Sequence, residues 1–227
     1  MALARLLLLL ELCLYAACFV CGIVTAATTT LVQGNFGGHC MLYGLVSYNG
    51  SAISIQSSSS ASLCYFVSAI SVLVAVVCFS LSLYWIYVFC IETQIARERV
   101  WMNVMLVLSG VFLFFLLVTG CMLKIGRDTL CKSIVNAVPN ITSCEAAESL
   151  QWVSPLNGQK FYSNLYKAET SAWVNFFFWI IVALLVFFQK RQSSTGRLSG
   201  PAEGLFGDPG VTAEETEPFF NRPARPQ

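Results

Sequence analysis

Four runs of apolar residues, each long enough to cross a lipid bilayer as a helix, dominate this sequence of 227 residues. An α-helix rises about 1.5 Å per residue, so about 20 residues cross a hydrocarbon core of about 30 Å. Apolar residues make up 56% of the chain and charged residues 11%, and the mean hydropathy is +0.69, far from the balance of a water-soluble domain. The sequence therefore predicts an all-α membrane protein built as a four-helix transmembrane bundle. The predicted spans are residues 6–28, 65–89, 101–123 and 172–188.

The segments between the spans form two outer loops, a short inner loop and a tail. The outer loops cover residues 29–64 and 124–171, the inner loop covers 90–100, and the bundle as a whole covers 1–190. In the first outer loop, Asn49-Gly50 stands between two runs of strand-forming residues, which predicts a small β-hairpin. The serines at 57–60 are expected to lead flexibly into the second span. Residues 191–227 mix Pro, Gly, Ser and Glu with few large apolar residues, which predicts a disordered cytosolic tail.

Two N-glycosylation acceptor sequences fall in the two outer loops. Asn49-Gly50-Ser51 lies in the first loop and Asn140-Ile141-Thr142 in the second. Lys and Arg residues are divided almost equally between the two sides of this layout, so the positive-inside rule does not decide the orientation. The acceptors place both outer loops in a lumen or outside the cell, and both termini in the cytosol. This orientation predicts a multi-pass protein of the secretory pathway, in the plasma membrane or a vesicle membrane.

Four of the ten cysteines also belong to the outer loops, Cys40 and Cys64 to the first and Cys131 and Cys144 to the second. Paired cysteines persist in oxidising compartments, which agrees with a lumenal or extracellular position. Four cysteines allow three connectivities. The pairs Cys40–Cys64 and Cys131–Cys144 are favoured because each closes a short stretch within one loop, and the first would staple the hairpin. Each pair would stabilise the fold by roughly 2–4 kcal/mol.

The first apolar run could instead be a cleaved secretory signal, because Arg5 precedes a leucine-rich stretch. The apolar region of a signal is about 7–15 residues long. This run continues through Val24, which favours a spanning helix. Cleavage stays an open alternative.

Three cysteines near or inside the spans suggest chemistry of their own. Cys18 and Cys21 have the spacing of a redox motif, but they lie inside the first span, where a thiolate is poorly stabilised, so a reactive pair is not expected. Cys90 lies at the predicted cytosolic end of the second span and is a candidate for palmitoylation. An unmodified thiol is the equal alternative.

Glu11 is the one acidic residue inside a predicted span. An acid at the bilayer centre costs roughly 2.5–3.5 kcal/mol, and less near a helix end, where Glu11 lies. Proton transfer or ion binding is one interpretation of this intramembrane acid. We favour a simpler one, because no second acid in the spans continues a relay: Glu11 reaches the cytosolic surface or pairs with Arg97, Arg99 or Lys190.

The sequence lacks the residue patterns of catalytic and metal sites. His39 is the only histidine, and neither a nucleophile elbow nor a glycine-rich phosphate loop is present. No cofactor and no metal are predicted, and the protein is not expected to be an enzyme. The net charge of +1 argues against a nucleic-acid partner.

The remaining functional classes are interaction and transport. The favoured hypothesis is an accessory, scaffold or trafficking protein whose partners are the lipid bilayer and other membrane proteins or further copies of this chain. The alternative is an oligomeric pore or transporter component. A conducting path needs several polar residues on one helix face, and Ser68, Ser71 and Ser82 form only a weak stripe of this kind.

Several short strings distributed along the chain are together specific. They include His39-Cys40, Ser62-Leu63-Cys64-Tyr65-Phe66, Trp85-Ile86-Tyr87, Leu130-Cys131, Phe161-Tyr162-Ser163-Asn164-Leu165 and Trp173-Val174-Asn175. In these strings the sequence resembles the transmembrane protein 179 family, and most of all its B form. The resemblance covers about residues 1–188 and leaves out the tail. It implies four spans with both termini in the cytosol, and no assigned activity.

Overall fold

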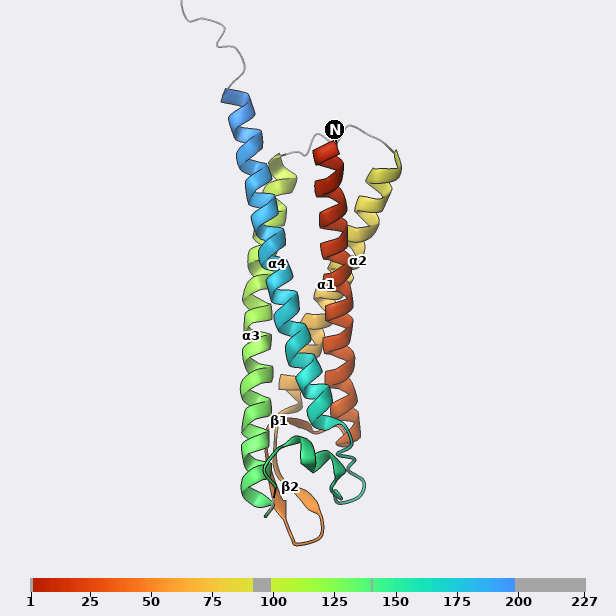
Figure 1. Cartoon of the computed structure of the whole chain (residues 1–227), viewed down its shortest axis with the longest axis vertical. Coiled ribbons are helices and arrows are strands. Elements are labelled where there is room, and N and C mark those ends of the chain that lie inside the picture. The colour runs from red at the N-terminus through yellow and green to blue at the C-terminus, as the bar shows by residue number, and fades with distance from the viewer. Residues whose placement is uncertain (1, 92–98, 140, 199–227) are drawn as a thin grey trace, which may run out of the picture. The chain divides into compact units, whose positions relative to one another are not determined.

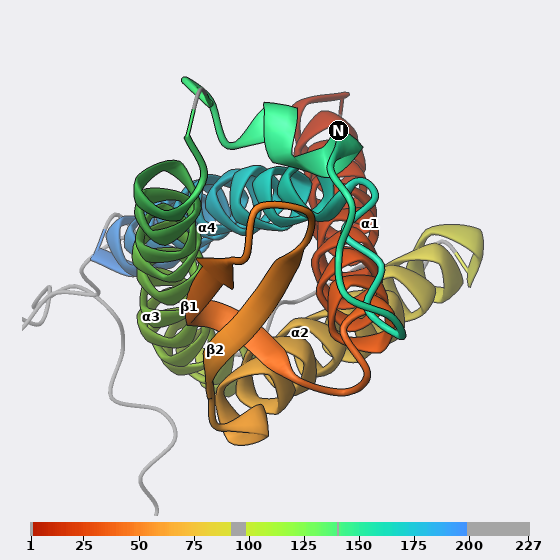
Figure 2. The ribbon, with the colours of Figure 1, turned by 90° about the horizontal axis from the view of Figure 1, so that it is seen from below.

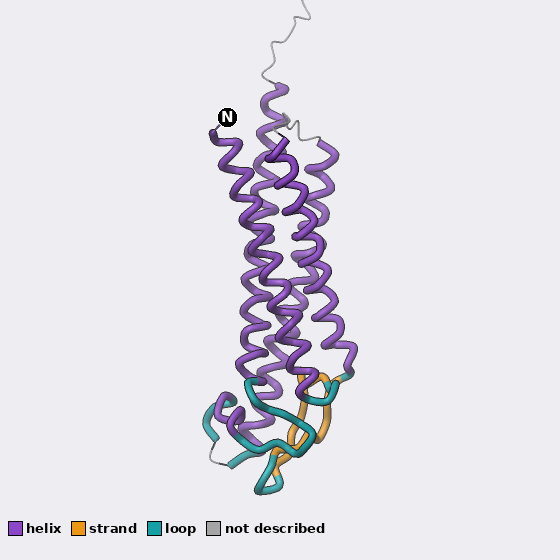
Figure 3. The backbone as a smooth tube through the Cα atoms, turned by 90° about the vertical axis from the view of Figure 1, so that its right-hand side faces the viewer, coloured by secondary structure: helices purple, strands orange, loops and turns teal. Residues whose placement is uncertain are grey.

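The computed structural model describes residues 2–91, 99–139 and 141–198 of the chain. Four long helices alternate in direction, and a β-hairpin and a short 3₁₀ helix lie at one end (Figures 1 and 3). We call this the hairpin end; it comprises the described residues of 36–60 and 138–160. The elements are α1 (Ala2–Asn35), β1 (Cys40–Tyr48), β2 (Ile53–Ser59), α2 (Ala61–Ile91), α3 (Arg99–Ala137), η1 (Glu145–Ser149) and α4 (Phe161–Leu198). The predicted fold class, a helical bundle with a small hairpin, is confirmed.

The chain divides into two units, Met1–Lys190 and Arg191–Gln227. The first unit holds the hairpin end and most of the bundle, and the features described below belong to it. The second unit contains the last residues of α4 and then residues 199–227, which lie outside the described residues, as does the tail predicted there.

All four helices are long and apolar enough to cross a membrane. The qualifying stretches are Leu6–Asn35, Ala61–Val88, Val100–Ala137 and Phe161–Gln192. Their outward surfaces are apolar, with exposed side chains such as Val20, Val76, Val107 and Phe177. Lipid tails are as apolar as these side chains, so hydrocarbon can cover this surface where water would not.

The third helix extends well past the end of its predicted span. It reaches Ala137, so the segment predicted as the second outer loop begins as helix. Leu130 and Ile134 lie one turn apart on this extension and are fully buried. β1 packs on the same region, where a Cβ added to Gly126 would lie 2.9 Å from the Cβ of Leu42. The helix continues because β1, far away in the sequence, gives it a surface to pack against.

The two strands are antiparallel and form the predicted hairpin. Tyr48 pairs with Ile53 across the turn, in which Gly50 has a φ of 90°, a conformation that glycine adopts without strain. Residues 57–59, expected to be flexible, belong to β2, and Ser59 stands opposite Cys40. The backbone of β1 supplies the partners that order this serine tract.

A disulfide between Cys40 and Cys64 joins the start of β1 to the first turn of α2, with the two Cα atoms 5.7 Å apart. The hairpin is therefore stapled as the sequence predicts. Figure 2, which looks onto the hairpin end, shows both strands lying across the end of the bundle.

Three aromatic rings close the hairpin end between α1 and α4. The ring of Trp152 lies 5.0 Å from that of Phe36, just after α1, and 5.6 Å from that of Phe161, the first residue of α4. The rings of Phe36 and Phe161 are 6.2 Å apart and perpendicular, a favourable arrangement for aromatic pairs. Beside them, the backbone N–H of Asn157 donates to the carbonyl of Asn35 at 2.9 Å. The end of α1, the second loop and the start of α4 thus meet at one place.

The first two helices pack closely in the middle of the bundle. A Cβ added to Gly22 would lie 2.8 Å from the carbonyl oxygen of Ser71 and 3.0 Å from the Cβ of Ala75. Cys18 and Ala26, one turn away on either side of Gly22, are also buried. Small side chains on one face of α1 therefore let the two backbones approach, as they do in other membrane helices.

Candidate functional site

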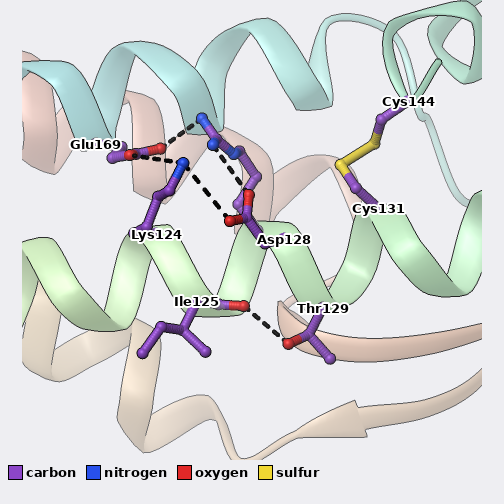
Figure 4. Close-up of polar contacts among 8 residues, drawn as sticks. Lys124, Ile125, Asp128, Thr129, Cys131, Cys144 and Glu169 are labelled. Carbon is purple, nitrogen blue, oxygen red and sulfur yellow. Dashed lines mark hydrogen bonds and ion pairs between the residues drawn. A yellow bond between two sulfur atoms is a disulfide. The ribbon is translucent and has the colours of Figure 1, made fainter.

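A buried ion pair joins α3 to α4 near the hairpin end. Nη1 of Arg127 is in ionic contact with Oε2 of Glu169 (Figure 4). Only 7% of the Arg127 side chain and 10% of the Glu169 side chain are exposed. The two residues face each other because α3 and α4 run antiparallel and both extend beyond the predicted spans.

Two further charged residues, Lys124 and Asp128, complete the cluster, and both are more exposed than the buried pair. Nζ of Lys124 lies 3.5 Å from Oδ2 of Asp128 and 3.8 Å from Oε1 of Glu169. Nη2 of Arg127 donates to Oδ1 of Asp128 at 3.0 Å. Two cations thus face two carboxylates, and the cluster is electrically neutral. We call Lys124, Arg127, Asp128 and Glu169 the ion cluster.

Two tyrosines of α4 cover the guanidinium group of Arg127. The rings of Tyr162 and Tyr166 are stacked, with centroids 6.3 Å apart and planes inclined by 21°. Cζ of Arg127 lies 5.7 Å from the first centroid and 5.4 Å from the second. These distances allow a cation–π interaction with each ring. The guanidinium group of Arg127 is therefore positioned by the two aromatic rings as well as by the carboxylates.

The ion cluster was not predicted from the sequence. Lys124, Arg127 and Asp128 do carry a local signal, since residues three and four apart lie on one helix face. The carboxylate that completes the cluster comes from a different helix, and its position depends on the register between α3 and α4.

The second loop is tied to the helices at two further points. A disulfide joins Cys131 of α3 to Cys144, with Cα atoms 5.2 Å apart. Glu148 of η1 accepts hydrogen bonds from the backbone N–H of Ser163 at 2.7 Å and from its hydroxyl at 3.2 Å. Ser163 lies in the first turn of α4, where backbone N–H groups have no partner in the helix and a negative charge is favourable. Glu148 thus anchors the loop and caps α4.

The acceptor Asn49 lies exposed at the tip of the hairpin. Its Oδ1 accepts hydrogen bonds from the backbone N–H of Ala52 at 3.1 Å and from the Ser51 hydroxyl, also at 3.1 Å. The second acceptor, Asn140, lies outside the described residues, between α3 and η1.

Glu11 is buried at the opposite end of the bundle, with 1% of its surface exposed. Its Oε1 accepts a hydrogen bond from Nε2 of Gln189 on α4 at 2.7 Å. The expectation that the acid reaches the surface therefore does not match its position. Of the cations considered as partners, Arg97 and the side chain of Arg99 lie outside the described residues.

A small cavity adjoins Glu11 inside the bundle. The volume open to the centre of a water molecule is about 10 Å³, close to what one water needs. Side chains from all four helices line it: Glu11, Tyr15, Trp85, Trp101, Met102, Met105 and Val186. The cavity is too small for an organic ligand.

The cysteines of the spans differ in their surroundings. Cys90 is exposed, in keeping with its assignment as a candidate for acylation, which nothing in the geometry tests. Cys18 and Cys78 are fully buried on facing turns of α1 and α2, where the rings of Phe19 and Phe79 lie 5.5 Å apart. Sequence reasoning considered Cys21 as the neighbour of Cys18, but the buried thiol opposite Cys18 belongs to α2.

Among the described residues, no group of three or more His, Cys, Asp or Glu side chains is arranged to hold a metal ion. His39 is exposed at the hairpin end, where its Nδ1 lies 3.5 Å from the Ser58 hydroxyl.

Comparison with known proteins assigns the chain to a family. A family model described as the transmembrane protein 179/179B claudin domain matches residues 7–219. The chain belongs to this family. A protein named transmembrane protein 179B from Danio rerio is 59% identical over 219 residues, which cover 96% of this chain and 97% of the relative. Proteins of the same name from Homo sapiens and Mus musculus are 42% and 40% identical, each over 82% of this chain and 84% of the relative. No solved structure matches the chain.

Membership in the transmembrane protein 179/179B family confirms the resemblance found in the sequence. Together with the four apolar helices, it makes the protein a multi-pass membrane protein whose helices contact the lipid bilayer. The family match continues to residue 219, well beyond residue 188, where the resembling strings end. The tail is therefore largely part of the family pattern, and leaving it out was wrong.

Proposed function

We propose that this protein is a non-enzymatic membrane protein that binds other membrane proteins through its hairpin end, in an accessory, scaffold or trafficking role. The observation that carries the proposal is the construction of that end. Two disulfides, the Glu148 cap and three packed aromatic rings fix its loops to the helices, and the ion cluster joins α3 to α4 beside it. A surface that is already ordered loses little conformational entropy on binding, so its contacts contribute more to affinity.

Apolar side chains on this ordered surface support a binding role. Leu45 of β1 and Val153 of the second loop are 45% and 40% exposed, and both belong to the hairpin end. The other exposed residues of the hairpin end are mostly polar, and a few exposed apolar side chains within a polar surround are typical of transient interfaces.

The charged groups favour structure over catalysis. In the ion cluster each cation already has a carboxylate partner, so neither a free acid nor a free base is offered to a substrate. A catalytic acid or base needs access to the reacting group, which Arg127 and Glu169 lack because they are buried. These features support a non-enzymatic role.

We further propose that the hairpin end faces a lumen or the outside of the cell and that both termini are cytosolic, in the plasma membrane or a vesicle membrane. Two disulfides at one end support an oxidising surround for that end. The acceptor Asn49 at the exposed tip is well placed to receive a glycan, and we propose that Asn49 and Asn140 both carry one.

An oligomeric pore or transporter component is the alternative, and the interior of the bundle gives it little support. Tyr15, Phe112 and Trp179 are buried side by side across the middle of the bundle. The hydroxyls of Ser71 and Ser82, which suggested a polar stripe, donate to backbone carbonyls of their own helix at 2.8 Å. A path for ions would have to form between copies of the chain.

The test is quantitative co-purification of membrane proteins in mild detergent. Leu45→Ser and Val153→Ser are combined in one variant, and Lys167→Ala, an exposed change on α4, serves as the control. We expect a defined set of membrane proteins to be enriched with the wild type and the control and to be lost with the double variant. Equal recovery with all three forms would contradict binding through the hairpin end. Ion flux through liposomes containing the purified protein would favour the alternative.

A further inference from the structure

The interior of the bundle holds two thiols on facing turns of α1 and α2. Cys18 of α1 and Cys78 of α2 are both 0% exposed, and the rings of the residues that follow them, Phe19 and Phe79, lie 5.5 Å apart. Cys18 lies one turn from Gly22, where an added Cβ would come within 3.0 Å of Ala75. Cys78 lies one turn from Ala75. The two cysteines therefore face each other where the backbones of α1 and α2 are close.

The thiol of Cys21, which shares a redox-motif spacing with Cys18, has different surroundings. Cys21 is half-buried, and its carbonyl accepts a hydrogen bond from the Ser171 hydroxyl of α4 at 2.9 Å. Its position is therefore defined by α4, whereas Cys18 is turned towards α2. This difference makes Cys21 a natural control for Cys18.

We propose that Cys18 and Cys78 are a redox pair whose oxidation to a disulfide joins α1 and α2 covalently inside the membrane. The geometry is suitable because a disulfide needs two backbones that lie close together, as α1 and α2 do beside Gly22 and Ala75. The oxidant is an organic hydroperoxide that dissolves in hydrocarbon. This inference is independent of the proposed binding role.

The reaction consumes one hydroperoxide for each disulfide. One sulfur attacks the peroxide, the O–O bond breaks, and the oxygen that leaves takes up a proton as an alcohol, giving a sulfenic acid. The second sulfur attacks the sulfenic sulfur, the S–S bond forms, and the hydroxyl group leaves with the second thiol proton as water. Two thiols are oxidised by two electrons, and the peroxide is reduced by two. Burial makes the reaction slow, because a thiolate is scarce in an apolar surround.

The bond would change how the helices are held together. Cys40–Cys64 already links β1, which follows α1, to α2 at the hairpin end, but α2 leans away from the other helices towards its other end (Figures 1 and 2). A disulfide in the middle of the bundle would limit how far α2 can separate from α1. Polar reductants such as glutathione do not enter hydrocarbon readily, so the linked form would persist.

The test is disulfide mapping of the full-length protein in lipid nanodiscs. The protein is treated with cumene hydroperoxide, free thiols are blocked with N-ethylmaleimide, and peptides are analysed without reduction. We expect a peptide joining Cys18 to Cys78 that is absent before oxidation and disappears on reduction. Cys13, exposed on α1 within the membrane, reports that the peroxide has reached the helices.

Variants separate this pair from its neighbours. Cys78→Ser should abolish the linked peptide, and Cys21→Ser should leave it unchanged. Recovery of Cys18 and Cys78 as free thiols in wild-type protein whose Cys13 has been oxidised would overturn the proposal. A peptide joining Cys18 to Cys21 would also overturn it. Mapping the wild type requires no substitution, so these results do not depend on how a variant folds.

Discussion

Arg127 of α3 and Glu169 of α4 form an ion pair that is almost closed off from solvent. Removing two charges from water costs several kcal/mol for each ion, which close contact and further partners must offset. Arg127 has such partners in Asp128 and the rings of Tyr162 and Tyr166. The pair therefore fixes the register of α3 against α4, since a shift of one turn in either helix would separate the buried Glu169 carboxylate from Arg127 and Lys124.

Loss of one partner should be costly. Glu169→Gln leaves the buried Arg127 charge with only the half-exposed Asp128 as a countercharge, and we expect the free energy of unfolding in detergent to fall by about 3 kcal/mol, the lower end of the range for a broken buried pair. Asp128→Asn is the control, because the Asp128 side chain is 44% exposed, and it should cost less than about 1 kcal/mol. Replacing both charges, with Arg127→Met and Glu169→Leu, should recover most of the loss. Equal effects of the two single changes would contradict a special role for burial.

Gly22 should tolerate no larger side chain. In Gly22→Ala the new methyl group meets the backbone oxygen of Ser71, which is not free to move, so α1 and α2 must separate. We expect a loss of about 1–3 kcal/mol, the usual cost of overpacking. Gly110→Ala is the control, because an added Cβ there has no neighbour within 4 Å. Thermal unfolding of both variants checks the prediction, and a Gly22→Ala variant as stable as the control would refute it.

Both disulfides can be tested by peptide mapping, and the second also by its effect on stability. Non-reducing peptide analysis is expected to find Cys40 joined to Cys64 and Cys131 joined to Cys144. Changing Cys131 and Cys144 together to Ser should lower the free energy of unfolding by about 2–4 kcal/mol. A link between Cys131 and either cysteine of the first loop would show that the loops are connected to each other.

Glycosylation tests the orientation. Removal of N-glycans by an amidase should change the electrophoretic mobility of the wild type, and Asn49→Gln and Asn140→Gln should each remove one step. Ser51→Ala and Thr142→Ala should reproduce the two losses, because they destroy the acceptor and keep the Asn. If neither Asn variant changes the mobility, the hairpin end does not face the lumen.

We expect Cys90 to be acylated, because it is exposed near the end of α2 that we propose to be cytosolic. Cys90→Ser should abolish incorporation of a clickable palmitate analogue, whereas Cys13→Ser, an exposed thiol inside the membrane, should not. Equal labelling of all three forms would identify Cys90 as an unmodified thiol.

The bilayer made much of the fold predictable. A spanning helix must satisfy its backbone groups internally and match the hydrocarbon thickness, so the four apolar runs could be recognised without knowledge of any contact. The hairpin was also accessible, because Asn49-Gly50 between two runs of strand formers is a local signal.

Features that depend on contacts between distant segments could not be predicted. The continuation of α3 to Ala137 requires β1 beside Gly126, and the burial of Arg127 requires Glu169 from another helix. The facing positions of Cys18 and Cys78 are of the same kind, because they depend on how α1 packs against α2. In the sequence, Cys21 was the obvious neighbour, because spacing along the chain says nothing about which helix lies opposite.

The meeting of Phe36, Trp152 and Phe161 has a consequence for biosynthesis. Chains are made from the N-terminus, so Phe36 leaves the ribosome long before Phe161, which begins the last helix to be inserted. Until α4 is in place, the ring of Phe36 has no completed site to pack into. The backbone carbonyl of Asn35 also lacks its hydrogen bond from Asn157 until the second loop has been made. The hairpin end can therefore be sealed only after translation of the fourth span, and an unsealed end distinguishes an unfinished chain from a finished one.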